Sequence, residues 1–536
     1  MDMPSLRRSC FLPTLMLSAA AALLAAAVEA APVDLTQASI ADLENAMAKG
    51  SLTSEKLTKL YLARIKAYDK QGPAINAVIT LNPAALDTAR ALDAERRSKG
   101  PRGPLHGIPV ILKDNYNTAD LPTTAGSFML RGSIPPQDAF LVKKLRDAGA
   151  IVLAKVNLSE FASGGAHSSI GGQTLNPHDL TRTPSGSSGG TGAGIAAVFA
   201  PLGMGTDTGG SIRGPSTSNG VVGLKPTHGL LSRGGIVPLA LSFDTGGPLA
   251  LNVADVAAAL GVMTGIDPAD AATQKSAGKF ETDYTRYLKA DALKGARIGI
   301  ARDFMGQDQE VDWVIEASLD AMRKQGATIV EVHYPKWLLQ TKTEFYNVIR
   351  RPEFAAQITD YLITLKPGYP RSHKELMDLS ETLTSPRDGY TPNGSRWALF
   401  KEEANSGTLT SPQYLAVRDH GLPLVRAEIE GILSSNQLDA IVYPTSPRRP
   451  ARIDADPVPG ATGGESATNF ANLTGFPDLI VPAGFTTGGL PIGISFFGPA
   501  FSEPKLLGLG YSFEQATKAR RLPVHTPALP GEKIGT

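Results

Sequence analysis

Cysteine is almost absent from this sequence. The 536 residues contain one cysteine, Cys10, which precedes an apolar run near the N-terminus. A disulfide needs two cysteines, and a thiolate zinc site needs several. The composition therefore excludes disulfides and thiolate metal sites. If the segment around Cys10 is removed after export, a cysteine nucleophile is excluded as well.

An excess of charge of either sign is also missing. Lys and Arg total 52 and Asp and Glu total 51, which leaves a formal net charge of +1. Nucleic acids and anionic membranes attract proteins with a basic excess, so we expect no nucleic-acid partner. Hydrophobic residues make up 42% of the chain, which suffices for a large core and excludes a wholly disordered chain.

Motifs for metals and nucleotides are lacking too. None of the eight histidines has HExxH spacing or belongs to a compact ligand cluster, and no Walker lysine motif is present. We therefore expect no cofactor and no metal. A metal site assembled from residues far apart in the sequence stays open at this stage.

The N-terminus has the three parts of a secretory signal. Arg7 and Arg8 form a basic start, residues 12–28 are apolar, and small residues end at Ala30. This pattern predicts a signal peptide over residues 1–30, cleaved after Ala30, and a periplasmic or secreted protein with no stable membrane association after cleavage. Two alternatives remain open: a membrane anchor, for which the run is short, and twin-arginine instead of general export.

From residue 31 onwards, predicted helices and strands alternate. Buried strands are predicted at residues 108–112, 150–154, 296–301 and 328–332. Helices are predicted after a capping box at Ser39 and at residues 57–65, 87–97 and 140–148. The alternation predicts an α/β fold whose sheet is covered on both faces. Because no linker is evident, we expect one domain over residues 31–536, with surface loops at residues 366–396 and 446–465.

Serine and glycine concentrate at residues 183–213, which read TPSGSSGGTGAGIAAVFAPLGMGTDTGGSIR. Glycine lets successive backbone N–H groups converge on one point without interference from Cβ atoms. A nest at Thr208, Gly209, Gly210 and Ser211 could hold the oxyanion of an acyl-transfer intermediate. An anion-binding loop or a plain tight turn would have the same composition, so the residues alone leave these alternatives open.

Longer motifs resemble the amidase signature family. They are residues 107–109 (GIP), 112–115 (LKDN), 155–161 (KVNLSEF), 185–190 (SGSSGG), 205–213 (GTDTGGSIR), 220–227 (GVVGLKPT), 439–445 (DAIVYPT) and 490–494 (LPIGI). The resemblance extends from about residue 34 to about residue 520, with the motifs in the same order. It implies a single large α/β domain, with a mixed central β-sheet surrounded by α-helices.

Within this family, the chain is most similar to bacterial peptide amidases, which remove the C-terminal amide of peptides. The similar segments are residues 102–107 (RGPLHG), 171–174 (GGQT) and 502–506 (SEPKL). One departure is that Ile212, Arg213 and Gly214 follow Ser211, where some peptide amidases have bulkier or charged residues. This departure leaves the substrate open.

The resemblance implies a Ser–Ser–Lys triad. Ser211 would be the nucleophile, Ser187 the bridging serine on a cis peptide bond, and Lys113 the base. A serine hydroxyl needs an adjacent base to become a nucleophile. Lysine can act as that base where burial favours its neutral form, and an apolar run precedes Lys113.

Further roles are expected around the triad. The backbone N–H groups of the predicted oxyanion hole belong to Thr208, Gly209, Gly210 and Ser211. Ser188 is expected either to orient the lysine by hydrogen bonding or to fill a turn. Asp207 and Arg213 are expected to form a structural ion pair that holds the nest.

These features together predict an exported serine amidohydrolase that cleaves small-molecule or peptide amides through an acyl-enzyme. Its specificity pockets are expected in loops that include residues 334–396 and 446–465. Three alternatives differ in class: an ammonia-releasing amidotransferase subunit, an ester or urethane hydrolase, and an exported binding protein with an inactive amidase fold. The predicted signal peptide argues against the first, and the intact triad argues against the last.

Overall fold

The computed structural model describes residues 33–454 and 466–534, so the predicted signal peptide lies outside the described residues. The strands are β1 (Val33–Asp34), β2 (Val78–Leu81), β3 (Pro109–Lys113), β4 (Ile151–Val156), β5 (His167–Ser168), β6 (Gly172–Gln173), β7 (Leu202–Asp207), β8 (Val222–Lys225), β9 (Thr245–Ala250), β10 (Arg297–Ala301), β11 (Thr328–Val332), β12 (Ala440–Pro444), β13 (Asp478–Phe485), β14 (Pro491–Phe497) and β15 (Lys533–Ile534). The helices are α1 (Ile40–Ala48), α2 (Ser54–Tyr68), α3 (Ala85–Lys99), α4 (Phe140–Asp147), α5 (Gly189–Ala196), α6 (Arg213–Asn219), α7 (Val253–Met263), α8 (Gln309–Lys324), α9 (Lys336–Leu362), α10 (His373–Thr382), α11 (Gly394–Ala404), α12 (Pro412–Ala416), α13 (Leu422–Ser435), α14 (Asn469–Thr474) and α15 (Glu503–Thr517).

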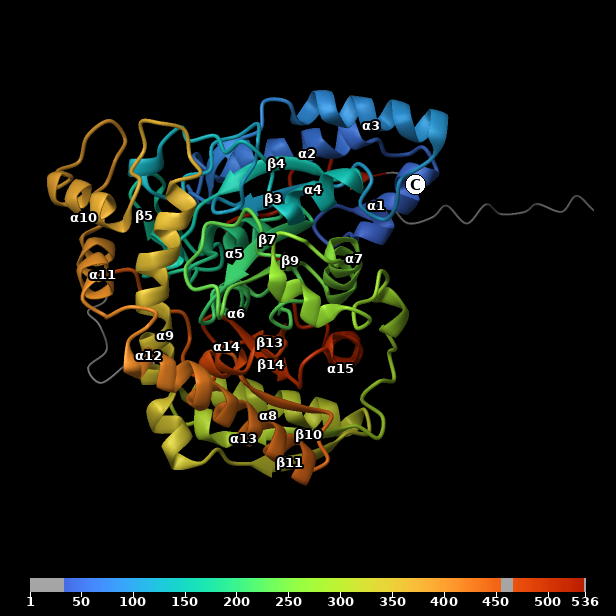
Figure 1. Cartoon of the computed structure of the whole chain (residues 1–536). Coiled ribbons are helices and arrows are strands. Elements are labelled where there is room, and N and C mark those ends of the chain that lie inside the picture. Colours follow the sequence, from blue (N-terminus) through green and yellow to red (C-terminus); the bar gives the residue numbers. More distant parts are fainter. Residues whose placement is uncertain (1–32, 455–465, 535–536) are drawn as a thin grey trace, which may run out of the picture.

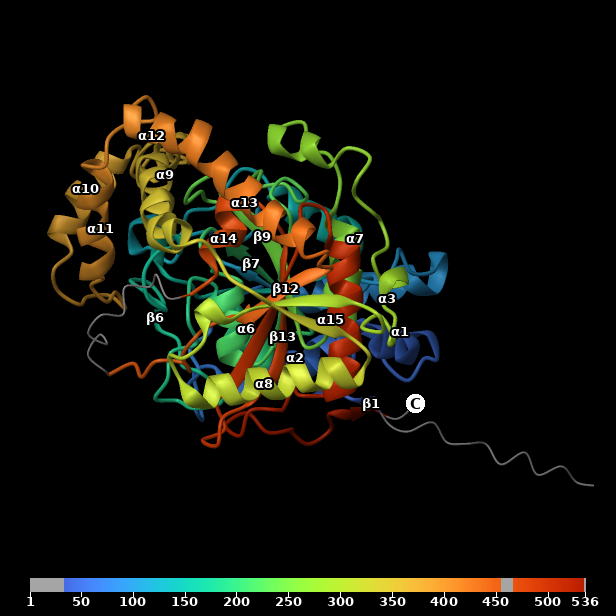
Figure 2. The same ribbon diagram turned by 90° about the horizontal axis from the view of Figure 1, so that it is seen from below.

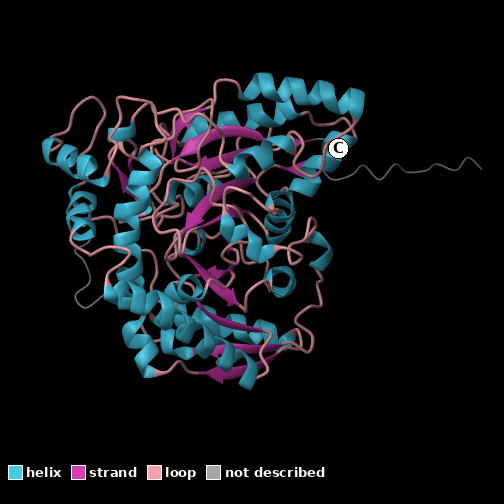
Figure 3. Cartoon of the chain, viewed as in Figure 1, coloured by secondary structure: helices cyan, strands magenta, loops and turns pink. Residues whose placement is uncertain are grey.

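One 11-stranded sheet runs through the molecule (Figure 1), in the order β11-β10-β12-β14-β13-β8-β9-β7-β3-β4-β2. Strand β3 is parallel to β4 and β7, and β10 is parallel to β11 and β12; the other pairs are antiparallel. The sheet is therefore mixed, and helices surround it (Figure 3). This confirms the predicted single α/β domain.

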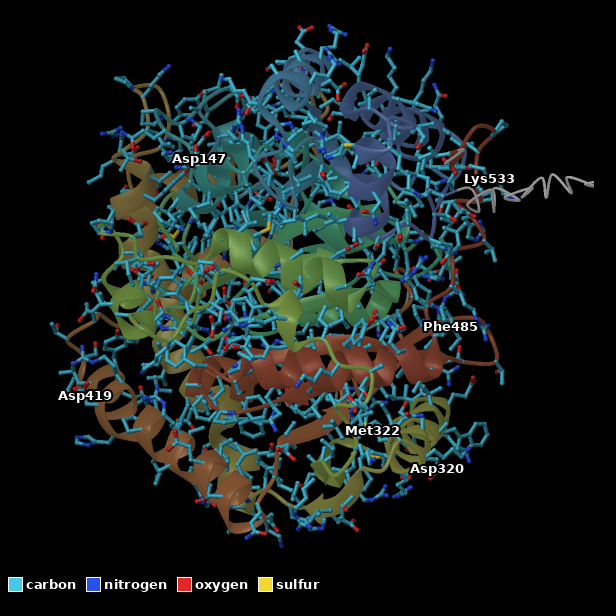
Figure 4. All side chains as sticks on the ribbon, turned by 90° about the vertical axis from the view of Figure 1, so that its right-hand side faces the viewer. Asp147, Asp320, Met322, Asp419, Phe485 and Lys533 are labelled. Atoms are coloured by element: carbon cyan, nitrogen blue, oxygen red, sulfur yellow. The ribbon has the colours of Figure 1, made fainter. Side chains whose placement is uncertain are left out.

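Helices cover both faces of the sheet, as strand β13 shows. A Cβ atom on Gly510 of α15 would meet Leu479 and Val481, so α15 lies against that face. Side chains alternate along a strand, so Ile480 lies on the opposite face. A Cβ atom on Gly493 of the neighbouring strand β14 would meet both Ile480 and Thr217 of α6, so α6 lies against that face. On the first face α15 contacts both α7 and α8 (Figure 4). The sheet is thus buried on both sides, as its apolar strands require.

Most predicted elements are present close to the predicted positions. Ser39 begins α1 with the expected capping box, in which Ser39 and Asp42 satisfy each other's backbone N–H groups. Strand β11 has the predicted bounds, and β3, β4 and β10 lie within one or two residues of theirs.

The prediction of loops for residues 334–396 and 366–396 is wrong in part. Helix α9 spans 27 residues with Pro352 inside it, and α10 begins at His373, after the N-cap residue Ser372, whose side chain accepts the Glu375 N–H. Pro352 inside α9 and the many Pro, Gly and Ser residues at 366–396 weakened the helical pattern in the sequence. Tertiary packing stabilises these helices, because Phe354, Leu376 and other residues of α9–α11 share one buried cluster. Within the described ranges, no helix is long and apolar enough to cross a bilayer.

Candidate active site

Lys113 is the last residue of β3, and the neighbouring parallel strand β7 ends at Asp207. Both strands therefore deliver side chains to the same edge of the sheet. The Lys113 Nζ atom lies 2.6 Å from Ser187 Oγ, 2.7 Å from Thr206 Oγ1 and 3.4 Å from the Thr206 carbonyl oxygen. The predicted base and the predicted bridging serine are thus in direct contact.

The surroundings of Lys113 favour its neutral form. The side chain is fully buried, and burial lowers its pKa to about 7, although the charges of Asp207 and Asp244 act in the opposite direction. A neutral amine has two hydrogens and one lone pair. The two Thr206 oxygens can accept the hydrogens, which leaves the lone pair to accept a hydrogen bond from the Ser187 hydroxyl.

The glycines of α5 bring Ser187 to this position. A Cβ atom on Gly190 would lie 2.3 Å from the Asn157 carbonyl oxygen, and one on Gly192 would lie 2.8 Å from the Asn219 amide nitrogen of α6. Only glycine permits these approaches, so α5 can pack tightly between the end of β4 and α6. The Gly186–Ser187 peptide bond just before α5 is cis, as the resemblance implied.

Ser211 lies in the loop that joins β7 to α6, beside this pair. The Ser188 N–H donates to the Ser211 carbonyl oxygen at 3.1 Å, which fixes the loop against the residue that follows Ser187. Ser211 is half-buried, and its hydroxyl has no hydrogen-bond partner among the described residues. The structure therefore brings the three predicted triad residues together and leaves the Ser211 hydroxyl available.

The backbone of this loop provides hydrogen-bond donors. Gly210, whose φ of 127° lies in the region that favours glycine, donates its N–H to Asp207 Oδ1 at 2.9 Å. The N–H groups of Thr208, Gly209 and Ser211 have no partner in residues 33–454 and 466–534. Three of the four expected donors are thus free, and the Gly210 N–H is engaged within the loop.

A buried ionic cluster fixes the position of the loop at residues 208–211 from the protein interior. Arg213 contacts Asp207 at 2.9 Å and Asp478 at 3.0 Å, and all three side chains are fully buried. Asn472 accepts from Arg213 at 2.6 Å and donates to Asp207 at 2.9 Å. Burial alone would raise the pKa of Asp207, but the charge and hydrogen bonds of Arg213 outweigh it and lower that pKa. The expected ion pair between Asp207 and Arg213 is therefore present, within a larger network.

Ser188 contacts Thr206 and not Lys113. Its hydroxyl donates to the Thr206 carbonyl oxygen at 3.1 Å and accepts the Thr206 N–H at 3.3 Å. Asn115 also donates to Thr206 Oγ1, at 3.0 Å. Ser188 can thus orient the lysine only through Thr206, a residue that lies inside the motif at 205–213 but that sequence reasoning did not single out.

Two residues from distant segments cover the loop. A Cβ atom on Gly209 would lie 2.7 Å from the Tyr346 hydroxyl of α9, and Tyr346 stacks on Phe243 with ring centroids 5.5 Å apart. The Thr468 hydroxyl donates to the Gly209 carbonyl oxygen at 3.4 Å. No sequence motif indicated either residue, because each belongs to a segment without a recognisable pattern.

In the described part of the chain, no group of three or more His, Cys, Asp or Glu side chains could hold a metal ion. The arrangement instead offers a free serine hydroxyl, a second serine in contact with a buried amine, and free backbone N–H groups nearby. These groups suit acyl transfer through a serine.

Comparisons with known proteins identify the family of this chain. A sequence model of the family named Amidase matches residues 56–507. The X-ray structure of native peptide amidase from Stenotrophomonas maltophilia is 39% identical, covers 92% of this chain and 99% of its own, and superposes with a TM-score of 0.82. A glutamyl-tRNA(Gln) amidotransferase subunit from Thermoanaerobacter pseudethanolicus is 35% identical over 501 residues, which are 92% of this chain and 99% of that protein. A probable amidase of Arabidopsis thaliana is 35% identical over 503 residues, 91% and 92% of the two chains.

The fold and these matches define an α/β enzyme that acts on amide C–N bonds. The chain belongs to the amidase family, the amidase signature family that its motifs predicted.

Proposed function

We propose that the protein is an exported serine amidase that hydrolyses carboxamides, with C-terminally amidated peptides as its substrate class. The contact of 2.6 Å between the buried Lys113 amine and the Ser187 hydroxyl carries this proposal. An amine with a pKa of about 7 can accept a proton near neutral pH. The similarity to a peptide amidase supports the substrate class.

Acylation begins when Ser211 Oγ attacks the amide carbon. Its proton passes to Ser187 Oγ as the Ser187 proton passes to Lys113 Nζ, so the serines stay neutral overall and the lysine becomes charged. The free N–H groups of the loop at residues 208–211 stabilise the negative oxygen of the tetrahedral intermediate. The C–N bond then breaks, and the leaving nitrogen takes a proton back through Ser187, which releases ammonia and an acyl ester on Ser211.

Deacylation repeats these steps with water. A water molecule attacks the ester carbon and passes its proton through Ser187 to Lys113. The C–O bond to Ser211 breaks, Ser211 regains a proton, and the carboxylic acid leaves. No step needs a metal or an organic cofactor.

An ammonia-releasing amidotransferase subunit is the second candidate, because a relative of that name matches almost the whole chain. Such a subunit works in a complex, whereas the proposed hydrolase works alone. Ester and urethane hydrolysis use the same groups, so substrate profiling separates these activities from amide hydrolysis.

We expect the purified chain alone to release ammonia from C-terminally amidated peptides and to leave their internal peptide bonds intact. Coupled ammonia detection and mass spectrometry of the peptides measure the two products. Ser211→Ala should abolish the release, because it removes the attacking oxygen. Turnover of only fatty or aryl amides would contradict the substrate class, and release that requires an added partner protein would favour the amidotransferase candidate.

Export is proposed from the basic start, the apolar run and the small residues before Ala31. Mass spectrometry of the periplasmic or secreted fraction should find an N-terminus near Ala31. A replacement of Arg7 and Arg8 by Lys tests twin-arginine export, because Lys keeps the basic start of a general signal but removes the arginine pair that the twin-arginine route needs. Full-length chain that begins at Met1 in the cytosol would contradict the proposal.

A further inference from the structure

A cleft of about 770 Å³ lies between α13, α14 and the 3-10 helix at Ala271–Ser276. Figure 2 shows α13 and α14, which contact each other, side by side. None of Lys113, Ser187 and Ser211 lines the cleft. It is therefore separate from the candidate active site, although Asn472 of α14 contributes to both.

Most of the charged residues that line the cleft are cations. Its charged lining residues are Arg233, Lys275, Lys279, Arg418, Arg426 and a single carboxylate, Glu430. We call it the basic cleft.

Two of these cations have acidic partners. Arg233 pairs with Asp270, and Arg418 pairs with Asp419, which Figure 4 labels at the outer surface. Their charges are therefore largely compensated within the protein, so they contribute less than the remaining cations to the attraction of an external anion.

The other three cations have no such partner. Lys275, Lys279 and Arg426 contact no carboxylate within 4.0 Å in the described part of the chain. Lys279 lies 4.6 Å from the Phe501 ring centroid, and Arg426 donates to the Thr474 carbonyl oxygen at 3.0 Å. Neither contact neutralises a charge, so three cations face one concave surface on which Glu430 is the one carboxylate among the lining residues.

These cations are close enough to repel one another. Burial lowers the pKa of Lys275, and the positive charges of Arg426 and Arg233 lower it further, while the charge of Asp270 acts in the opposite direction. Burial, and then Arg233 and Lys275, also lower the pKa of His228 at the wall of the cleft to about 3, so this histidine adds no charge at neutral pH. An anion bound among these groups would relieve the repulsion.

We infer that the basic cleft binds a small organic anion with at least two negative charges, carried by phosphate or carboxylate groups. Lysine and arginine side chains bind both groups by charge-assisted hydrogen bonds. The volume lies within the range of small-molecule sites, roughly 300–1,000 Å³. Leu241, Phe476 and Phe501 give the cleft an apolar wall for the carbon skeleton of such a ligand. This site is independent of the proposed amide hydrolysis.

Titration calorimetry on the full chain, with inorganic pyrophosphate and citrate as separate probes at constant ionic strength, tests the inference. We expect saturable binding of one anion per chain for at least one probe, and a higher Tm in its presence. Tighter binding of pyrophosphate would indicate that the natural ligand carries phosphate groups, and tighter binding of citrate would indicate carboxylate groups. Lys275→Gln combined with Arg426→Gln should weaken binding by about tenfold or more, because two charge-assisted contacts are lost, while amide hydrolysis stays within about twofold.

A matched double variant, Lys49→Gln with Arg97→Gln, removes the same charge from exposed positions at the ends of α1 and α3. It should bind the probe as the unmodified chain does. The inference is overturned if neither probe saturates, if the cleft variant binds unchanged, or if both double variants weaken binding equally, since that last result would show a general field effect and not a site.

Discussion

A folded Lys113→Arg variant should lose amide hydrolysis about as severely as Lys113→Ala. Arginine keeps the positive charge and nearly the length of lysine, but it does not lose its proton in proteins. It therefore cannot accept the proton that reaches Ser187 from Ser211. Loss of a general base typically costs about 10²–10⁴-fold in rate, and a base that acts as one unit with its nucleophile can cost more. The kcat/KM of each variant, per folded molecule, measures the effect.

Lys155→Arg is the matched control. Lys155 is also fully buried, and it lies on β4 opposite Leu112 of β3, but it pairs with Asp114 at 2.9 Å and does not contact the candidate triad. Both substitutions enlarge a buried side chain, so both should lower the Tm. Only Lys113→Arg should abolish kcat/KM. Substantial activity in folded Lys113→Arg would refute the proton relay.

The same proposal predicts how the rate depends on pH. Because burial lowers the Lys113 pKa to about 7, a rise in pH converts the charged lysine to its neutral, active form. The neutral fraction increases from about a tenth at pH 6 to about nine tenths at pH 8. We therefore expect kcat/KM to rise about tenfold over this interval with a single ionisation. A flat profile, or one that falls through this range, would contradict a lysine base.

The sequence predicted the triad because each of its members lies in a short, recognisable motif. Ser187, Asp207, Ser211 and Arg213 come from two segments that are close in the chain, and glycines mark both segments. Lys113 ends an apolar strand, so its burial could be anticipated from the residues before it. The resemblance that these motifs carry was sufficient to predict which residues lie together, and the catalytic roles of the three triad residues stay predictions.

Contacts between distant segments could not be predicted in this way. Asn472 and Asp478 lie 259 and 265 residues beyond Arg213, and their partnership with it depends on how β13 and α14 pack beside β7 and α6. Tyr346 reaches the loop from α9, which lies in the segment at residues 334–396 that was predicted as loops without fixed motifs. Tertiary packing overrode the local signal at these positions, which is where single-sequence reasoning fails.

Arg213→Gln should lower both stability and activity by large amounts. The substitution removes the cation and leaves Asp207 and Asp478 buried together without a counter-charge. Removal of one partner from a buried ion pair costs about 3–5 kcal/mol, which chemical denaturation measures as a lower free energy of unfolding. Asp207 also accepts the N–H groups of Gly210 and Ile212, so the loop that carries Ser211 should shift. A displacement of about 1 Å can cost 10²-fold in rate, and we expect kcat/KM per folded molecule to fall by at least about that factor.

Arg64→Gln provides the control for this prediction. Arg64 forms a buried ion pair with Glu532 at 2.9 Å, but it joins α2 to the C-terminal segment and to the Ala197 carbonyl oxygen at the C-terminal end of α5, and it touches none of the triad residues. The Arg64→Gln variant should lose a similar free energy of unfolding, because it too leaves a buried carboxylate, Glu532, without its counter-charge. Its kcat/KM per folded molecule should stay near that of the unmodified chain, because the loop at residues 208–211 is unaffected. If Arg213→Gln kept its kcat/KM in the folded fraction, or if Arg64→Gln lost activity equally, the ionic cluster would have no specific role in holding Ser211 in place.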